Sequence, residues 1–319
     1  YVYTSYGGYD SRFNATYDKD RMDLIPEGPL IQYSGCDSDA LLVSATKMLK
    51  ELESMPRQAR LLTKVLMPAA KAFLQMMLNG IRFNPDAMTT DDNGKEVHAR
   101  TFLERHRDRL LEECLTMIPP KIRKRHEDDL RLTRDRLLQD ILYSKDGLNL
   151  KPFKTTKKTG APSVDRESLS NLEHPFVDKY TAWDELASSI VKYMETFAEY
   201  LAQDHRIHAS YMTAGAATWR SSAKRPSVQQ IPERRWYAKH IKVQFEAEHG
   251  TELISADYKQ LQMKGAAFLA NEHNMLKVFA ENGDVHNETL VGLRGLGRLR
   301  SMAPKEARRF AKNVGFGSI

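Results

Sequence analysis

Apolar residues recur at helical spacing through most of the first two hundred positions. Intervals of three and four residues predict helices over about 38–52, 57–78 and 176–203. The second should end at Asn79-Gly80, a common helix stop. Between 100 and 145, basic and acidic residues interleave as they do on exposed helices, and Pro119-Pro120 interrupts the pattern. This part of the chain is therefore expected to be mainly helical.

Alternating apolar and polar positions appear later. Ile207, Ala209 and Tyr211 predict a strand over 205–212, and a second apolar run predicts another over 252–257. Residues 145–165 are rich in Lys, Thr, Gly and Pro, which favours a loop. Many helices followed by a few strands indicate an α+β, multidomain architecture.

Composition narrows the class of protein. A length of 319 residues favours two or three domains. We find no run of 18 apolar residues and therefore expect no membrane-spanning helix. Cys36 and Cys114 are too few for a disulfide framework or a cysteine-rich zinc site, and a reducing, cytoplasmic setting is expected.

Positive charge is concentrated in two segments. Residues 213–242 hold seven Lys or Arg against one Glu, and residues 294–312 hold the same numbers. Because the whole chain carries only +6, the remainder is net acidic. Such segregation indicates a polyanion site, although two solvated basic faces would give the same pattern.

Two local patterns suggest chemistry. Asp257 follows an apolar run and precedes a predicted helix, where it could hold Mg²⁺ or simply cap the helix. Arg308, Lys312 and Phe316 are spaced by four residues, which keeps them on one helix face with a drift of about 40° per step. They could grip a triphosphate and stack a base, or form a basic surface helix with Phe316 in the core.

Taken together and in order, these motifs resemble the family A DNA polymerases in a bacteriophage-like form. The matching segments are Tyr33 and Asp37 in Tyr-x3-Asp spacing, KTGAPS (158–163), Thr218 with Arg220, PSVQQIP (226–232), DYKQLQMK (257–264), GDVH (283–286), and RRFAK through FG (308–317). The resemblance covers nearly the whole chain.

The resemblance implies a role for each matched residue. Asp257 and the carbonyl of Tyr258 would serve a two-ion Mg²⁺ site, and Lys312 would act in catalysis. The dNTP would be bound by Arg308, Lys312, Phe316, His286, Gln260 and Gln262. Primer-template DNA would be bound by Arg220, Gln229, Gln230, Lys157 and Lys158. Tyr33 and Asp37 would remain from a 3′–5′ exonuclease site.

The resemblance also implies an architecture and partners. We expect an exonuclease-domain remnant over 1–55, a connecting helix and helical thumb over 56–203, and a partial antiparallel palm sheet with the start of the helical fingers over 204–319. The implied activity is template-directed DNA synthesis, in phage DNA replication. The partners would be primer-template DNA and dNTPs, with no membrane, and the protein would be a monomer in the cytoplasm of a bacterial host.

Several positions depart from the family pattern. Gln262 stands where Glu is usual, which should weaken but preserve discrimination against ribonucleotides. Lys264 replaces an Arg, Trp219 and Gly315 replace a Gly and an Asn, and Asp184 and Ser188 replace an Arg and a Lys. These substitutions suggest a divergent polymerase.

The family's second palm carboxylate motif is not found in this sequence, and neither are the first two exonuclease motifs. We therefore expect a chain truncated at both ends, with an incomplete Mg²⁺ site and no polymerase activity by itself. A DNA-binding fragment without catalysis remains an alternative. A third interpretation is a single-subunit RNA polymerase, because those enzymes share the catalytic arrangement of the palm.

Overall fold

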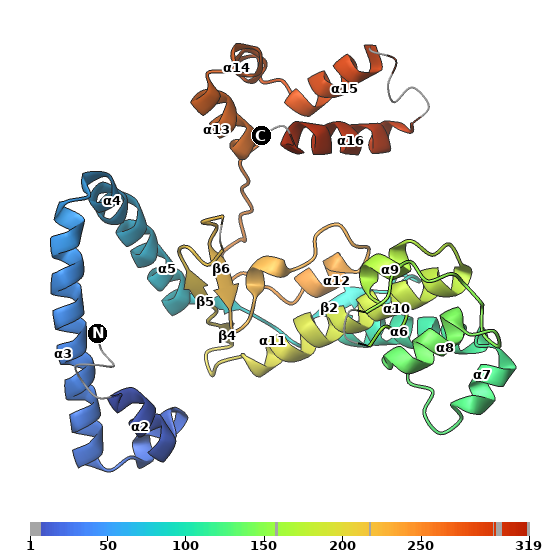
Figure 1. The fold of residues 1–319 in the computed structure, drawn as a ribbon, viewed down its shortest axis with the longest axis horizontal. Coiled ribbons are helices and arrows are strands. Elements are labelled where there is room, and N and C mark those ends of the chain that lie inside the picture. Colours follow the sequence, from blue (N-terminus) through green and yellow to red (C-terminus); the bar gives the residue numbers. More distant parts are fainter. Residues whose placement is uncertain (1–7, 157–158, 217, 296, 298–301, 318–319) are drawn as a thin grey trace. The chain divides into compact units, whose positions relative to one another are not determined.

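A computed structural model describes residues 8–156, 159–216, 218–295, 297 and 302–317. The chain divides into two compact units, Tyr1–Thr251 and Glu252–Ile319, and each is described by itself. The division at 251 differs from the expected boundaries at 55 and 203, which stay predictions. Figure 1 shows the elements of both units in chain order.

The first unit is mainly helical. Its helices are α2 (Tyr9–Thr16), α3 (Glu27–Glu53), α4 (Pro56–Leu61), α5 (Met67–Asn79), α6 (Ala99–Thr116), α7 (Pro120–Arg125), α8 (Asp135–Tyr143), α9 (Arg166–Ser170), α10 (Pro175–Ile190), α11 (Thr196–Glu199) and α12 (Ala238–Lys242). Short 3₁₀ turns cover Lys19–Leu24 and Val228–Gln230, and π-helical turns cover Leu62–Leu66 and Val191–Glu195. The three helices predicted from apolar spacing all form, and Pro120 begins α7, which confirms the expected break.

The strands of this unit pair in three small antiparallel sheets. They are β1 (Ile81–Arg82) with β4 (Arg206–Ile207), β2 (Met88–Thr90) with β3 (Glu96–His98), and β5 (Ser210–Met212) with β6 (Ser222–Lys224). The strand predicted over 205–212 therefore exists as two short strands, β4 and β5. Their antiparallel pairing agrees with the expected sheet type.

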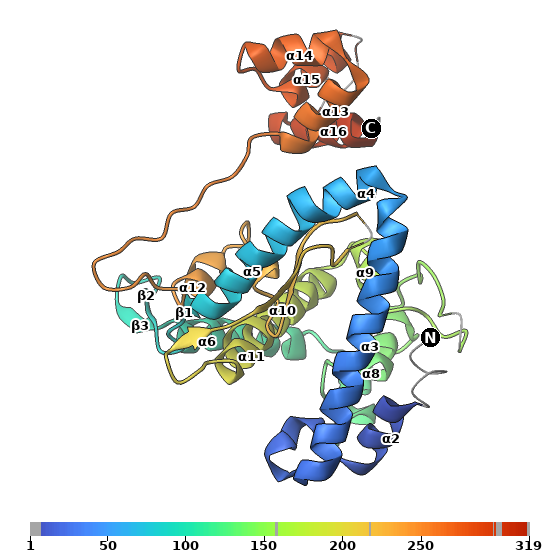
Figure 2. The same ribbon diagram turned by 90° about the vertical axis from the view of Figure 1, so that its left-hand side faces the viewer.

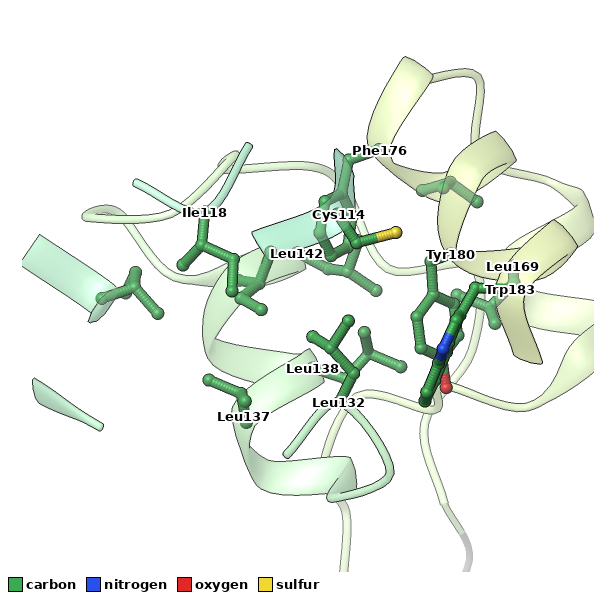
Figure 3. Close-up of a cluster of buried hydrophobic side chains, with 13 residues drawn as sticks. Cys114, Ile118, Leu132, Leu137, Leu138, Leu142, Leu169, Phe176, Tyr180 and Trp183 are labelled. Atoms are coloured by element: carbon green, nitrogen blue, oxygen red, sulfur yellow. The ribbon is translucent and has the colours of Figure 1, made fainter. Parts of the chain in front are cut away.

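Helix α10 links two buried apolar clusters. Phe176, Tyr180 and Trp183 join the first cluster, with side chains from α6, α8 and α9 (Figure 3). Leu186 and Ile190 join the second, which also holds Phe83 and Ile207 of the β1–β4 region. Because these positions recur at three- and four-residue steps, one helix can contribute to both clusters.

The helical segment Pro56–Asn79 corrects one expectation. Its 24 residues include an 18-residue window with a mean hydropathy of 1.3 and no buried share, so length and composition alone would let it cross a membrane. The lack of an unbroken apolar run therefore does not exclude a helix of this length and composition from spanning a membrane. A single such helix is weak evidence for a span, because the test considers length and composition only.

The second unit consists of four helices in its described part. They are α13 (Leu261–Ala270), α14 (His273–Ala280), α15 (Val285–Gly295) and α16 (Pro304–Gly317). Figures 1 and 2 both show α15 and α16 side by side. Ala307 and Ala311, one turn apart on α16, are fully buried. This pair carries most of the predicted nucleotide-binding residues.

The prediction of a strand over residues 252–257 is wrong. These residues form no regular secondary structure and pair with no described strand, and Ile254 is 91% exposed. Apolar alternation predicts a strand only when a neighbour supplies backbone hydrogen bonds and a covered face. Neither is present for this segment among the described residues.

Candidate functional site

The helix pair α15–α16 gathers cationic side chains. Arg308 and Lys312 are one turn apart on α16, directly after the buried Ala307 and Ala311. Opposite them on α15, His286 is only 5% exposed. Burial lowers the pKa of His286, and the nearby charges of Arg308 and Lys312 lower it further while Asp284 opposes them. Three of the predicted nucleotide-binding residues therefore lie together.

A carboxylate orients one of these cations. Arg308 donates from Nη2 to Oδ2 of Asp284 at 2.5 Å and from Nε to Oδ1 of Asn287 at 3.0 Å. The side chain of Asp284 is 18% exposed and that of Arg308 is 48% exposed. Burial opposes ionisation of Asp284, but the bond from Arg308 and the backbone amides of His286 and Asn287 hold its pKa below the ordinary value.

The turn before α15 fixes Asp284. Asn282 has a left-handed φ of 55°, and the Gly283 amide donates to the carbonyl of Val278 at 2.7 Å. A Cβ on Gly283 would lie 2.7 Å from Cγ1 of Val278, so this position requires glycine. Oδ1 of Asp284 then accepts from the His286 amide at 2.9 Å and caps the helix.

Asp257 and Tyr258 lie in the irregular segment before α13. Both are exposed, Tyr258 by 79%. Gln260, which precedes α13, has a left-handed φ of 55°, and its Oε1 is buried without a hydrogen-bond partner among the described residues. Gln262 is exposed on α13, one position before the buried Met263. A non-glycine residue at positive φ is strained, and such strain concentrates at functional sites.

The described residues do not form a two-ion metal site around Asp257. No group of three or more His, Cys, Asp or Glu residues in the described part of the chain could hold a metal ion. Two ions need more than one carboxylate between them. Asp257 could thus be one ligand of a magnesium site, but the residues described here do not complete it.

The predicted DNA contacts of the first unit lie around the β5–β6 hairpin. Arg220 is exposed just before β6, and its carbonyl accepts from the Gly215 amide at 3.1 Å. Gln229 donates from Nε2 to Oγ of Ser221 at 3.1 Å. Gln230 accepts from Nζ of Lys192 at 2.6 Å. The structure thus places Gln229 beside the hairpin and ties Gln230 to the turn after α10.

A cleft of about 640 Å³ lies between α10 and the segment 232–237. Asp184 and Ser188 line it, at the two positions that depart from the family's basic residues. Burial raises the pKa of Asp184. Glu185, also in the lining, pairs with Arg235 at 2.6 Å. The cleft wall on α10 is therefore acidic, and the opposite wall is basic.

Three predicted contacts fall outside what is described. Lys157 and Lys158 lie outside the described residues, and Phe316 lies in α16 with its side chain outside them. In the same loop, Lys154 pairs with Asp165 at 2.8 Å and also contacts Glu167.

Tyr33 and Asp37 share one face of α3 but are engaged locally. The Tyr9 hydroxyl donates to Asp37, and that hydrogen bond raises the pKa of Tyr9 to about 12. Lys19 donates from Nζ to the Tyr33 hydroxyl at 2.6 Å, and the Tyr33 ring stacks on Phe13 with centroids 4.0 Å apart. Within the described residues, this network forms no metal-binding cluster.

Sequence reasoning missed Asp284 and Asn287 as site residues. GDVH was matched only as a motif, and Arg308 lies 24 positions beyond Asp284. An acidic residue at a helix start followed three positions later by Asn was the only local signal.

The family description "DNA polymerase family A" matches residues 101–319. The chain is 30% identical over 291 residues to DNA polymerase I of Synechocystis sp., covering 90% of this chain and 27% of that protein. It is 29% identical over 309 residues to DNA polymerase I of Pseudomonas aeruginosa, covering 94% and 31%. The chain thus spans about three tenths of these relatives.

A solved structure shares the fold. It is the POL domain of Pol1 from M. smegmatis, in complex with DNA primer-template and dNTP. The TM-score is 0.67 at 22% sequence identity, and the match covers 90% of this chain and 47% of that one. At this identity the likeness concerns the fold alone.

Proposed function

The chain belongs to DNA polymerase family A, and we propose that it serves template-directed DNA synthesis. In the protein that contains it, a nucleotidyl group would pass from a dNTP to a primer 3′-hydroxyl. This proposal rests on one observation. Arg308 and Lys312 of α16 lie close to His286 of α15.

These side chains suit a triphosphate. Arg308 offers a planar donor set that matches phosphate oxygens, and Lys312 adds a point charge one turn away. His286 is held neutral by burial and by its cationic neighbours, so it can donate a hydrogen bond without adding charge. Lys312 would also stabilise the negative charge that develops on the leaving pyrophosphate. Phe316 would stack on the base or sugar, and Gln260 and Gln262 would line the nucleotide's sugar side.

Asp257 would contribute one metal-binding carboxylate, with the carbonyl of Tyr258 beside it. Bound Mg²⁺ ions would activate the primer hydroxyl and stabilise the leaving group. Because the described residues supply one carboxylate here, we propose no metal-dependent step for them alone. We propose that the 319-residue chain by itself does not extend a primer.

The first unit would bind primer-template DNA. Arg220 and Gln229 carry donors suited to the minor-groove acceptors that all base pairs share. The surrounding residues 213–242 are strongly basic, which supplies sequence-independent attraction to phosphates. An exonuclease role for Tyr33 and Asp37, a bacteriophage source and a cytoplasmic location stay predictions from the sequence.

Triphosphate binding by the purified chain tests this proposal. We expect inorganic triphosphate and dATP to bind, and Arg308→Ala or Lys312→Ala to weaken each at least tenfold by loss of a charge-assisted contact. Arg309→Ala is the matched control, because Arg309 is exposed on α16 next to Arg308. Isothermal titration gives the Kd values. Equal losses in all three variants, or no binding by the unaltered chain, would contradict the proposal.

A further inference from the structure

Asp284 performs two tasks with its two carboxylate oxygens. Oδ1 caps α15 by accepting from the His286 amide at 2.9 Å, and Oδ2 accepts from Nη2 of Arg308 at 2.5 Å. Asn287, one turn into α15, accepts from Nε of the same guanidinium at 3.0 Å. Arg308 is therefore held at two nitrogens by groups on the neighbouring helix.

The third guanidinium nitrogen is left for a ligand. Nη1 of Arg308 makes no hydrogen bond to a described residue, while the side chain stays 48% exposed. A free arginine loses much of its rotamer entropy when it is fixed on a ligand. A guanidinium already fixed by Asp284 and Asn287 would lose much less.

We propose that Asp284 is a positioning residue that holds Arg308 in the orientation needed to bind a nucleotide triphosphate, an inference that rests on the proposed function. Asp284 does not itself touch the triphosphate, since two like charges would repel. Its carboxylate fixes one edge of the guanidinium, and the opposite edge faces the ligand. Asn287 assists by holding Nε.

The opposite effect of Asp284 on triphosphate binding is also chemically possible. Asp284 could compete with the triphosphate for Arg308, and its removal would then strengthen binding. The two relations predict opposite signs for the same substitution, so one experiment separates them.

The test is Asp284→Asn in the purified chain, with the Kd for inorganic triphosphate measured by isothermal titration. Asparagine has one side-chain oxygen, which can keep the helix cap, since Asn and Asp cap equally well. It cannot also accept from Arg308. We expect the Kd to rise about three- to tenfold. Glu288→Gln is the control, an exposed carboxylate four residues along α15 whose substitution should leave the Kd unchanged.

A double-mutant cycle separates positioning from a purely structural role. In an Arg308→Ala background, Asp284→Asn should have no further effect on the Kd, because the cation that it positions is gone. Asp284→Glu should partly restore binding. Unchanged or tighter binding by Asp284→Asn, or equal losses with and without Arg308, would overturn the positioning role. If Arg308→Ala alone leaves binding intact, the proposed function itself fails.

Discussion

Trp219 occupies a position where the family resemblance leads us to expect glycine. It lies in the turn before β6 with a left-handed φ of 60°, and its side chain is 64% exposed. The family resemblance places glycine at this position, and glycine adopts positive φ without a steric penalty. A bulky residue there is strained by about 1–2 kcal/mol.

We predict that Trp219→Gly stabilises the chain by about 1 kcal/mol, after allowing for the greater freedom of glycine in the unfolded state. Trp219→Ala is the matched control, because it removes the same indole but keeps the Cβ that causes the strain. Urea unfolding gives both values. If the two variants are equally stable, the strain does not exist.

Some residues of the proposed nucleotide site could be predicted from the sequence, and others could not. Helical periodicity alone placed Arg308 and Lys312 on one face, because their spacing is local. Asp284 was not predicted as a site residue, because its hydrogen bond to Arg308 depends on how α15 packs against α16. Side-chain partners across helices are set by tertiary contacts, which one sequence does not encode in any local pattern.

Helices could be predicted from local periodicity. Helix α10 buries the apolar positions that its spacing indicated. The helix expected over 57–78 spans Pro56–Asn79 although its apolar positions are not buried. The strand expected over 252–257 failed because strand formation needs a partner. Helices satisfy their own backbone, and so their prediction from one sequence is safer.

Helix α12 is joined to its neighbours through a buried histidine. Nδ1 of His240 lies 2.6 Å from Oγ1 of Thr89 on β2, and its ring packs 4.5 Å from the ring of Phe102 on α6. Trp236 and His106 lie beside it. Burial lowers the pKa of His240 to about 4, and the charges of Lys239 and His106 act in the same direction while Asp92 opposes them.

This arrangement predicts an acid-sensitive first unit. A histidine with a lowered folded-state pKa stabilises the fold fully above its unfolded pKa of about 6.5, and this stability is lost as pH falls toward 4. We expect His240 to account for a loss of about 2 kcal/mol between pH 7 and pH 5. Unfolding of His240→Gln should show a correspondingly flatter pH dependence. His249→Gln, at an exposed site, should retain the full loss; a full loss in His240→Gln would contradict this role.

At the scale of the molecule, the predicted functions are divided between two units. The DNA-contact candidates Arg220 and Gln229 belong to the first, and Asp257 and the triphosphate cations belong to the second. The boundary at 251 lies just before the exposed segment that carries Asp257. The order of the motifs in the sequence was sufficient to predict the family. The exposed segment at this boundary was predicted to be a strand, and that prediction was wrong.

Primer extension tests the central claim most directly. The protein that contains residues 1–319 would be given a labelled primer-template, Mg²⁺ and one dNTP at a time. We predict incorporation of the templated dNTP only, and a loss of at least a thousandfold in rate for Asp257→Asn with DNA affinity unchanged. Glu252→Gln, five residues earlier in the same exposed segment, should keep full activity. Undiminished synthesis by Asp257→Asn, or incorporation that ignores the template, would contradict the account.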